Sequence, residues 1–322
     1  MALGMLVNGQ WTSKREQEDK EGRFLRPSTT FRNWITSNDV GEYEAERDRY
    51  HLYVSLACPW AHRTLIMRSL KGLTDAISIS VVNPYMGDEG WSFEDAPGVI
   101  PDPIHNAKFL REIYVASEEH FTGRVTVPIL WDKKTNTIVN NESREIIRML
   151  DTKFEGIAKP EIDLYPQHLR DKIDEIIDEI YDPINNGVYR AGFAIAQRAY
   201  EEAVTELFDA LDRWESVLAN QRYLCGNQLT EADICMFTTL LRFDPVYYSH
   251  FKCNVRHIWQ YPNLWGYLRD IYQMPGVAET CNLHHIKQHY YRSHPNVNPS
   301  GIVPVGPELD LTSDHGRDRL SP

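Results

Sequence analysis

Strand-like segments occur only in the first half of this chain. Short β-rich runs alternate with helix-like runs in the order βαβαββα, and we expect these elements at 50–55, 59–71, 77–82, 109–120, 127–132, 137–140 and 142–151. This alternation favours a mixed sheet covered by helices. After about residue 164 apolar residues recur with a helical period, at 171–181, at 197–219, from Thr230 onward and at 263–270. The sequence therefore predicts an α/β domain followed by an all-helical domain.

Two terminal extensions are expected to flank these domains, so the predicted boundaries are 1–47, 48–155, 164–280 and 281–322. The first extension is polar and charged, but its aromatic residues indicate that parts of it dock on a domain: Trp11, Phe24, Phe31 and Trp34. A long insertion at 83–102, rich in glycine, proline and acidic residues, interrupts the α/β domain. In the helical domain, Thr230 is the expected N-cap of a helix, with Asp233 completing a variant of the capping box.

The bulk composition excludes several classes of protein. A formal net charge of −12 argues against a nucleic-acid partner. The 5 cysteines are irregularly spaced, which predicts neither a disulfide framework nor a zinc site and suits a reducing compartment. No apolar run approaches the roughly 20 residues of a membrane span, and the first residues lack the basic region of a signal peptide. We therefore expect a cytoplasmic protein.

Cys58 is the main candidate for chemistry. It lies between an expected strand and an expected helix, and Pro59 suits the first helical position. The free N–H groups and dipole of a helix start favour thiolate over thiol. Ala61 stands where a C-x-x-C redox pair would have its second cysteine, so resolution of a mixed disulfide at Cys58 requires an external thiol. Most free cysteines are buried and inert, and we expect this of Cys225, Cys235, Cys253 and Cys281.

The arrangement of Cys58-Pro59 at the first helix, Val127-Pro128 before a hairpin, and a helical domain afterwards resembles the glutathione transferases. The first domain then resembles a thioredoxin fold. In that family the bond equivalent to Val127-Pro128 is cis, and it presents the preceding backbone to the cysteinyl part of glutathione. Glu142-Ser143 begins the next helix, where Ser143 suits the γ-glutamyl carboxylate and Glu142 could pair with the α-ammonium. Helix capping alone is the alternative for these two residues.

Longer motifs resemble the xi class of that family, the glutathionyl-hydroquinone reductases. They lie at 58–61 (Cys-Pro-Trp-Ala), 83–86, 90–93, 121–132, 185–194, 289–294 and 298–304. The resemblance spans nearly the whole chain, and only residues 1–30 and 308–322 look private to this protein.

The resemblance implies a reaction and a set of site residues. Cys58 would attack the sulfur of a glutathionyl-hydroquinone, and a second glutathione would resolve the mixed disulfide. Glutathione would be a co-substrate, with no permanently bound cofactor. Tyr189 and Tyr290 would assist the leaving hydroquinone, with Tyr291 as the competitor of Tyr290. The remaining contacts implied are Trp91 and Arg124 for glutathione and Phe93, with Tyr291, for the aromatic pocket.

Two alternative functions remain open at this point. An omega-like thiol transferase or dehydroascorbate reductase would share Cys58, and a non-catalytic binding protein would share the fold. His285 and His289 stand four residues apart, but they lack the acidic partner of an H-E-x-x-H motif, so we expect a polar tail helix rather than a metal site. The resemblance also implies a homodimer formed through the helical domain.

Overall fold

A computed structural model describes residues 4–13, 19–36, 41–159 and 162–320, and its contacts divide the chain into two compact units. Unit 1 combines the segments 1–16, 27–162 and 280–295, and unit 2 combines 17–26, 163–279 and 296–322. The expected C-terminal extension is therefore shared between the units. Lys14 to Glu18 of the first extension's charged run lie outside the described residues. No described helix has the length and apolar character needed to cross a membrane.

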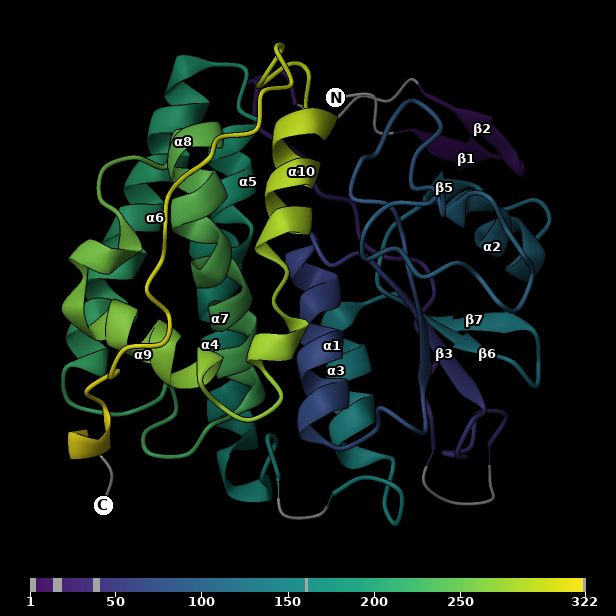
Figure 1. Cartoon of the computed structure of the whole chain (residues 1–322), viewed down its shortest axis with the longest axis horizontal. Coiled ribbons are helices and arrows are strands. Elements are labelled where there is room, and N and C mark those ends of the chain that lie inside the picture. Colours follow the sequence, from purple (N-terminus) through teal and green to yellow (C-terminus); the bar gives the residue numbers. More distant parts are fainter. Residues whose placement is uncertain (1–3, 14–18, 37–40, 160–161, 321–322) are drawn as a thin grey trace. The chain divides into compact units, whose positions relative to one another are not determined.

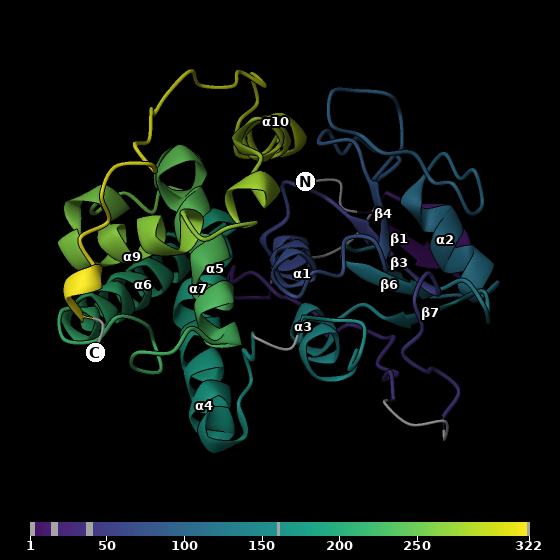
Figure 2. The same cartoon turned by 60° about the horizontal axis from the view of Figure 1, so that its bottom comes forward.

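Unit 1 is built on a four-stranded mixed sheet in the order β4-β3-β6-β7. Strand β3 runs parallel to β4 and antiparallel to β6, which pairs antiparallel with β7. Helices α1 and α3 cover one face and α2 covers the other (Figures 1 and 2). The bounds are β3 Tyr50–Val54, α1 Pro59–Leu70, β4 Ser78–Val81, α2 Leu110–Ser117, β6 Ile129–Asp132, β7 Thr137–Asn140 and α3 Ser143–Thr152. The predicted mixed sheet and its βαβαββα order are confirmed.

The N-terminal extension adds strands that the sequence reading did not predict. Strands β1 (Met5–Val7) and β2 (Gln10–Thr12) form a hairpin, and β1 also pairs with β5 (Gly123–Arg124). Asn8 and Gly9 both have positive φ at the hairpin turn, as an Asn-Gly pair favours. Further along, Phe31 stacks on Phe121 with ring centroids 5.4 Å apart, which confirms that this aromatic residue docks.

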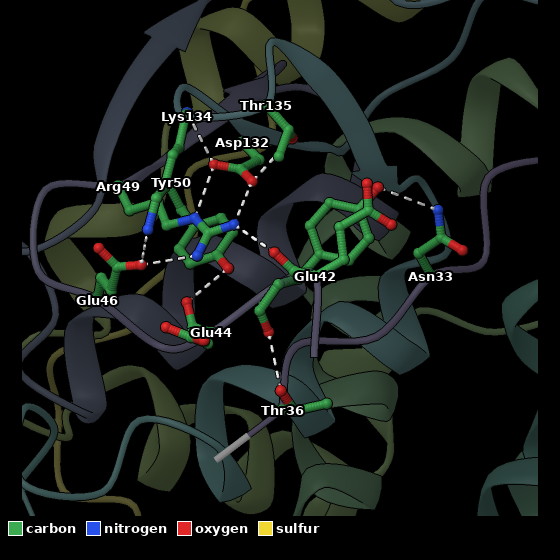
Figure 3. A network of polar contacts seen from close by, with 11 residues as sticks. Asn33, Thr36, Glu42, Glu44, Glu46, Arg49, Tyr50, Asp132, Lys134 and Thr135 are labelled. Carbon is green, nitrogen blue, oxygen red and sulfur yellow. Dashed lines mark hydrogen bonds and ion pairs between the residues drawn. The ribbon is translucent and has the colours of Figure 1, made fainter. Parts of the chain in front are cut away.

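A buried ion pair joins the ends of β3 and β6 (Figure 3). Arg49 donates to both carboxylate oxygens of Asp132, at 2.9 and 2.6 Å, and also to Glu46 at 2.7 Å. Asp132 further accepts from the Lys134 amide and the Thr135 hydroxyl, which begin the β6–β7 turn. The pair thereby fixes the hairpin that follows the Val127-Pro128 segment.

Unit 2 is helical among its described residues, as predicted. Thr230 and Asp233 form the expected capping box at the start of α7. Two helices continue into π-helical turns at Tyr181–Asn185 and Phe243–Tyr247, each containing Asp-Pro. Proline cannot donate the α-helical bond, which accounts for the local widening. The α-helices are α4 Arg170–Ile180, α5 Gly187–Gly192, α6 Gln197–Leu218, α7 Glu231–Arg242, α8 Tyr248–His250 and α9 Pro262–Tyr272, and short 3₁₀ turns occur at Gln167–Leu169, Ile258–Gln260, Ala278–Thr280 and Asp318–Leu320.

Helix α10 (Leu283–Ser293) belongs to unit 1 rather than to a polar tail. The helix itself was expected, but its assignment to a polar tail was wrong. His285, His289, Tyr290 and Tyr291 are all buried. One ring nitrogen of each histidine bonds to a main-chain carbonyl of the 83–102 insertion, His285 to Pro97 and His289 to Pro84, which periodicity alone did not reveal. No group of three His, Cys, Asp or Glu residues suited to a metal ion occurs in the described ranges.

Candidate active site

Cys58 is the N-cap residue of α1, directly after the loop that leaves β3. Its Sγ atom lies 3.7 Å from the carbonyl oxygen of Val127. Cys58 and Cys281 are partly exposed, whereas Cys225, Cys235 and Cys253 are buried, so the expectation that Cys281 is buried was wrong. Burial raises the pKa of Cys225 and of Cys253, so these two thiols are held protonated. Of the two partly exposed cysteines, Cys58 is the one that occupies the N-cap position of a helix.

The Val127–Pro128 peptide bond is cis, as the resemblance implied. This segment connects β5 to β6, and the buried Val127 side chain leaves its carbonyl oxygen facing Cys58. The Tyr114 hydroxyl is anchored at the neighbouring residue, where it donates to the carbonyl oxygen of Thr126 at 3.0 Å. Two segments nearly 70 residues apart in the sequence therefore meet at the thiol.

Glu142 and Ser143 lie at the start of α3. The Glu142 carboxylate accepts a hydrogen bond from the Arg144 amide at 3.3 Å, so it caps the helix, and it accepts another from Thr29 at 3.2 Å. Ser143 Oγ accepts from Arg63 Nη1 at 3.4 Å. Glu142 therefore caps α3 in this structure, while its contact with glutathione stays a prediction.

Trp91 and Phe93 lie on the 83–102 insertion, and both are buried. The Trp91 ring stacks on His289 of α10, with centroids 4.8 Å apart and an interplanar angle of 22°. Tyr290 packs edge-on against the same histidine, at 5.2 Å between ring centroids. Trp91 and Tyr290 therefore both contact the imidazole of His289, within unit 1.

Tyr291 is buried like Tyr290, so burial does not separate these two candidates. Arg124 lies on β5, where it is paired with Met5 of β1. The positions of Tyr291 and Arg124 are thus known, and their predicted roles stay predictions.

Comparison with known proteins identifies the family. Family models of the glutathione S-transferase N-terminal and C-terminal domains match residues 57–153 and 197–270. The solved structure of a xi-class glutathione transferase from Natrialba magadii is 55% identical, covers 99% of this chain and 98% of that one, and aligns with a TM-score of 0.95. This chain belongs to the xi class of glutathione transferases.

Two bacterial relatives of this transferase are similar over almost their full lengths. Glutathionyl-hydroquinone reductase YqjG of Escherichia coli is 54% identical and covers 98% of this chain and 99% of its own. The glutathione-bound structure of YqjG aligns with a TM-score of 0.89. Glutathionyl-hydroquinone reductase PcpF of Sphingobium chlorophenolicum is 50% identical and covers 96% of this chain and 98% of its own.

The helical unit of this xi-class transferase contains Tyr189 on α5. Its ring lies among aromatic side chains, with Phe251 at 5.5 Å and Tyr247 at 6.0 Å between centroids. The Arg26 guanidinium lies over the same ring, 4.7 Å from its centre. Arg26 comes from a segment that the sequence reading had set aside as private to this protein.

Sequence reasoning missed three residues that contact predicted site residues of this transferase. The sequence pattern around Arg63 indicates only a helix, yet Arg63 donates to Ser143. Arg26 carried no local pattern that could have pointed to Tyr189. His289 did carry a signal, because His285, His289 and Ser293 recur every four residues on one face of α10.

Proposed function

We propose that this xi-class transferase reduces glutathionyl-hydroquinones to hydroquinones, with glutathione as co-substrate. The observation that carries the proposal is the position of Cys58, whose Sγ lies 3.7 Å from the Val127 carbonyl beside a cis proline. The relatives YqjG and PcpF match nearly the whole chain, and both are named glutathionyl-hydroquinone reductases. Their names support the choice of substrate class.

The reaction has two steps in this proposal. The Cys58 thiolate attacks the glutathione sulfur, and the carbon–sulfur bond breaks. The electron pair stays on the ring carbon, which takes up a proton to give the hydroquinone. Cys58 is then bonded to glutathione through a mixed disulfide. A second glutathione thiolate attacks this disulfide, releasing oxidised glutathione and the Cys58 thiolate. Ala61 explains why the second glutathione is required.

The other predicted residues take their roles around this chemistry. The Val127-Pro128 backbone and the start of α3 at Glu142-Ser143 hold glutathione, together with Trp91 and Arg124. Phe93 and Tyr291 line the aromatic pocket. Tyr189 and Tyr290 supply phenolic hydroxyls, which can donate to or accept from the leaving hydroquinone.

Mass spectrometry after a single turnover tests the proposal. The full chain is mixed with a glutathionyl-hydroquinone in the absence of free glutathione. We expect a glutathione adduct on Cys58 and one equivalent of hydroquinone. Release of hydroquinone without an adduct, or no release at all, contradicts the mechanism. Dehydroascorbate reduction that depends on Cys58, without activity on a glutathionyl-hydroquinone, would support the omega-like alternative instead.

Tyr290→Phe and Tyr291→Phe decide which tyrosine serves the leaving group. General acid catalysis contributes about 10²–10⁴-fold in rate, so we expect Tyr290→Phe to lower kcat by about 10²-fold. Tyr291→Phe should act mainly on KM for the aromatic substrate. A larger loss of kcat in Tyr291→Phe would transfer the role to Tyr291.

We further propose a cytoplasmic homodimer formed through the helical unit. None of the 5 cysteines forms a disulfide bond, which suits a reducing compartment. Sedimentation at micromolar concentration should give about twice the chain mass of 37.4 kDa. A single species at the chain mass would refute the dimer.

A further inference from the structure

One face of α10 makes a regular series of hydrogen bonds to the 83–102 insertion. His285 Nε2 lies 2.6 Å from the carbonyl oxygen of Pro97, and His289 Nδ1 lies 2.9 Å from that of Pro84. One turn further on, Ser293 Oγ accepts from the Met86 amide at 3.0 Å. Residues spaced by four lie on the same side of a helix, so this face contacts the insertion at three successive positions.

These contacts determine which ring nitrogens carry protons. A carbonyl oxygen only accepts, so His289 donates through Nδ1 and His285 donates through Nε2. Burial lowers the pKa of His285, against the opposing effect of its bond to Pro97, which favours a neutral ring. The fit is close, because a Cβ added at Gly98 would lie 2.6 Å from His285 Nε2. The insertion is therefore attached to α10 by specific hydrogen bonds at three positions.

His289 makes a second contact that the other two residues do not. Its ring stacks on Trp91, which lies between the Pro84 and Pro97 attachment points. The histidine is buried, as are Trp91 and the adjacent Tyr290. One imidazole thus holds the insertion by a hydrogen bond and also holds the indole by its face.

We propose that His289 is a positioning residue that fixes Trp91 for glutathione binding. The hydrogen bond to Pro84 sets the orientation of the His289 imidazole. The stacked imidazole in turn sets the orientation of the Trp91 indole. This inference rests on the proposed function, because it requires Trp91 to be part of the glutathione site.

Two substitutions at His289 separate the two contacts. His289→Phe keeps a flat ring against Trp91 but loses the donor to Pro84. His289→Asn keeps an N–H near the Nδ1 position but loses the stacked ring. The matched controls are His284→Phe and His284→Asn, because His284 lies on the exposed side of α10. The four variants are made in the full chain carrying Cys58→Ser, and glutathione affinity is measured by titration calorimetry.

We expect each His289 variant to raise the Kd for glutathione about threefold to tenfold, the factor associated with one net hydrogen bond or one aromatic pair. The His284 variants should stay within about twofold of the parent, as expected for exposed positions. The deciding comparison repeats His289→Phe in a Trp91→Phe background. If His289 acts through Trp91, its effect on Kd falls below about twofold there, because coupled residues are not additive.

An unchanged Kd in both His289 variants would overturn the proposal, as would an equal rise with and without Trp91. Should the His289 variants fail to fold, Ser293→Ala tests the same attachment by removing the acceptor of the Met86 amide. It should raise Kd by about twofold to fivefold, and an unchanged Kd would then overturn the proposal. Absence of glutathione binding by the parent protein would instead contradict the proposed function itself.

Discussion

The Arg26 guanidinium lies 4.7 Å from the centre of the Tyr189 ring, and Arg26 Nε donates to Asn186 Oδ1 at 2.7 Å. Asn186 precedes the first residue of α5, the helix that carries Tyr189. Arg26 is therefore held by the same helix whose tyrosine it covers. The contact links Arg26 of the N-terminal segment to a predicted catalytic side chain within unit 2.

Replacing Arg26 should weaken catalysis through Tyr189. A cation over an aromatic ring contributes about 0.5–2 kcal/mol, so we expect Arg26→Met to lower kcat about threefold to tenfold. Arg23→Met is the matched control, because Arg23 lies on the same segment in an exposed pair with Glu202. Steady-state kinetics with a glutathionyl-hydroquinone gives the measurement. An equal loss in both variants, or no reduction of the Arg26 effect in a Tyr189→Phe background, would contradict this prediction.

Cys58 should react with iodoacetamide ahead of the other four cysteines. It is partly exposed at a helix start, where the dipole favours the thiolate. Burial raises the pKa of Cys225 and Cys253, which slows the reaction of both thiols with iodoacetamide. Cys281 is the useful comparison, since it is also partly exposed and lies 3.8 Å from His62 Nε2. Peptide mapping after brief labelling at pH 7 should find Cys58 modified first.

Activity should follow the labelling of Cys58. Removing a catalytic nucleophile costs several orders of magnitude in kcat, so Cys58→Ser should lose about 10³-fold or more. Cys281→Ala should retain activity within about twofold, because surface and half-exposed substitutions are usually small in effect. Faster labelling of Cys281 than of Cys58 would argue against the nucleophile proposed here.

The Arg49–Asp132 pair should be essential for the stability of unit 1. Both side chains are almost fully buried, and removing one partner of such a pair costs about 3–5 kcal/mol. We expect Asp132→Asn to lower the free energy of unfolding by about this amount. Lys134→Met is the control, since Lys134 is exposed and pairs only with the exposed Glu46 in this network. Urea unfolding of both variants measures the difference.

The same pair predicts a dependence on pH. Burial alone would raise the pKa of Asp132, but hydrogen bonds from Arg49, Lys134 and Thr135 outweigh it and lower the pKa below the ordinary value of 3.8. The stabilisation is therefore present above pH 3.8 and is lost as pH falls through the lower folded pKa. The difference in the free energy of unfolding between wild type and Asp132→Asn should therefore become smaller in that acidic range. A constant gap would show that the carboxylate charge is not the cause.

Features that depend on residues close together in the sequence were predicted well, and contacts between residues far apart in the sequence were not. The sheet elements and the Thr230 capping box follow local patterns, and they were predicted closely. Cys58 was recognised because Pro59 and the preceding strand mark a helix start in consecutive residues. By contrast, the Arg26–Tyr189 contact joins residues that share no local motif, and only folding brings them together.

The error at α10 has the same physical origin. The helix was predicted from local residues, but it was expected to belong to a polar tail. His285 and His289 are buried with their N–H groups donated to carbonyl oxygens that lie 188 and 205 residues earlier in the chain. Burying a polar side chain without a hydrogen-bond partner is costly, and a partner so distant in the sequence leaves no trace in the pattern of the helix.

Asp233 should stabilise unit 2 through the capping box of α7. Its carboxylate accepts from the amides of Leu224 and Thr230 and from the hydroxyls of Thr230 and Tyr267, at 2.8–3.0 Å. Asp233→Asn removes one of the two acceptor oxygens and leaves buried donors unsatisfied. Bonds to a charged group contribute about 1.5–3 kcal/mol each, so we expect a loss of about 3 kcal/mol at pH 7. Asp209→Asn, on the exposed side of α6, should change stability by less than about 0.5 kcal/mol.

The dependence on pH is opposite in sign to that of Asp132. Burial raises the pKa of Asp233 from 3.8 to about 6, although the four hydrogen bonds act against it. The folded state therefore binds a proton that the unfolded state releases, and this contribution to stability is complete below pH 3.8 and is lost as pH rises through about 6. Asparagine does not titrate, so the gap in unfolding free energy between wild type and Asp233→Asn should widen as pH falls from 6 to 4. Urea titrations across that range measure the gap, and a gap that narrows would mean that the folded protein holds Asp233 ionised throughout.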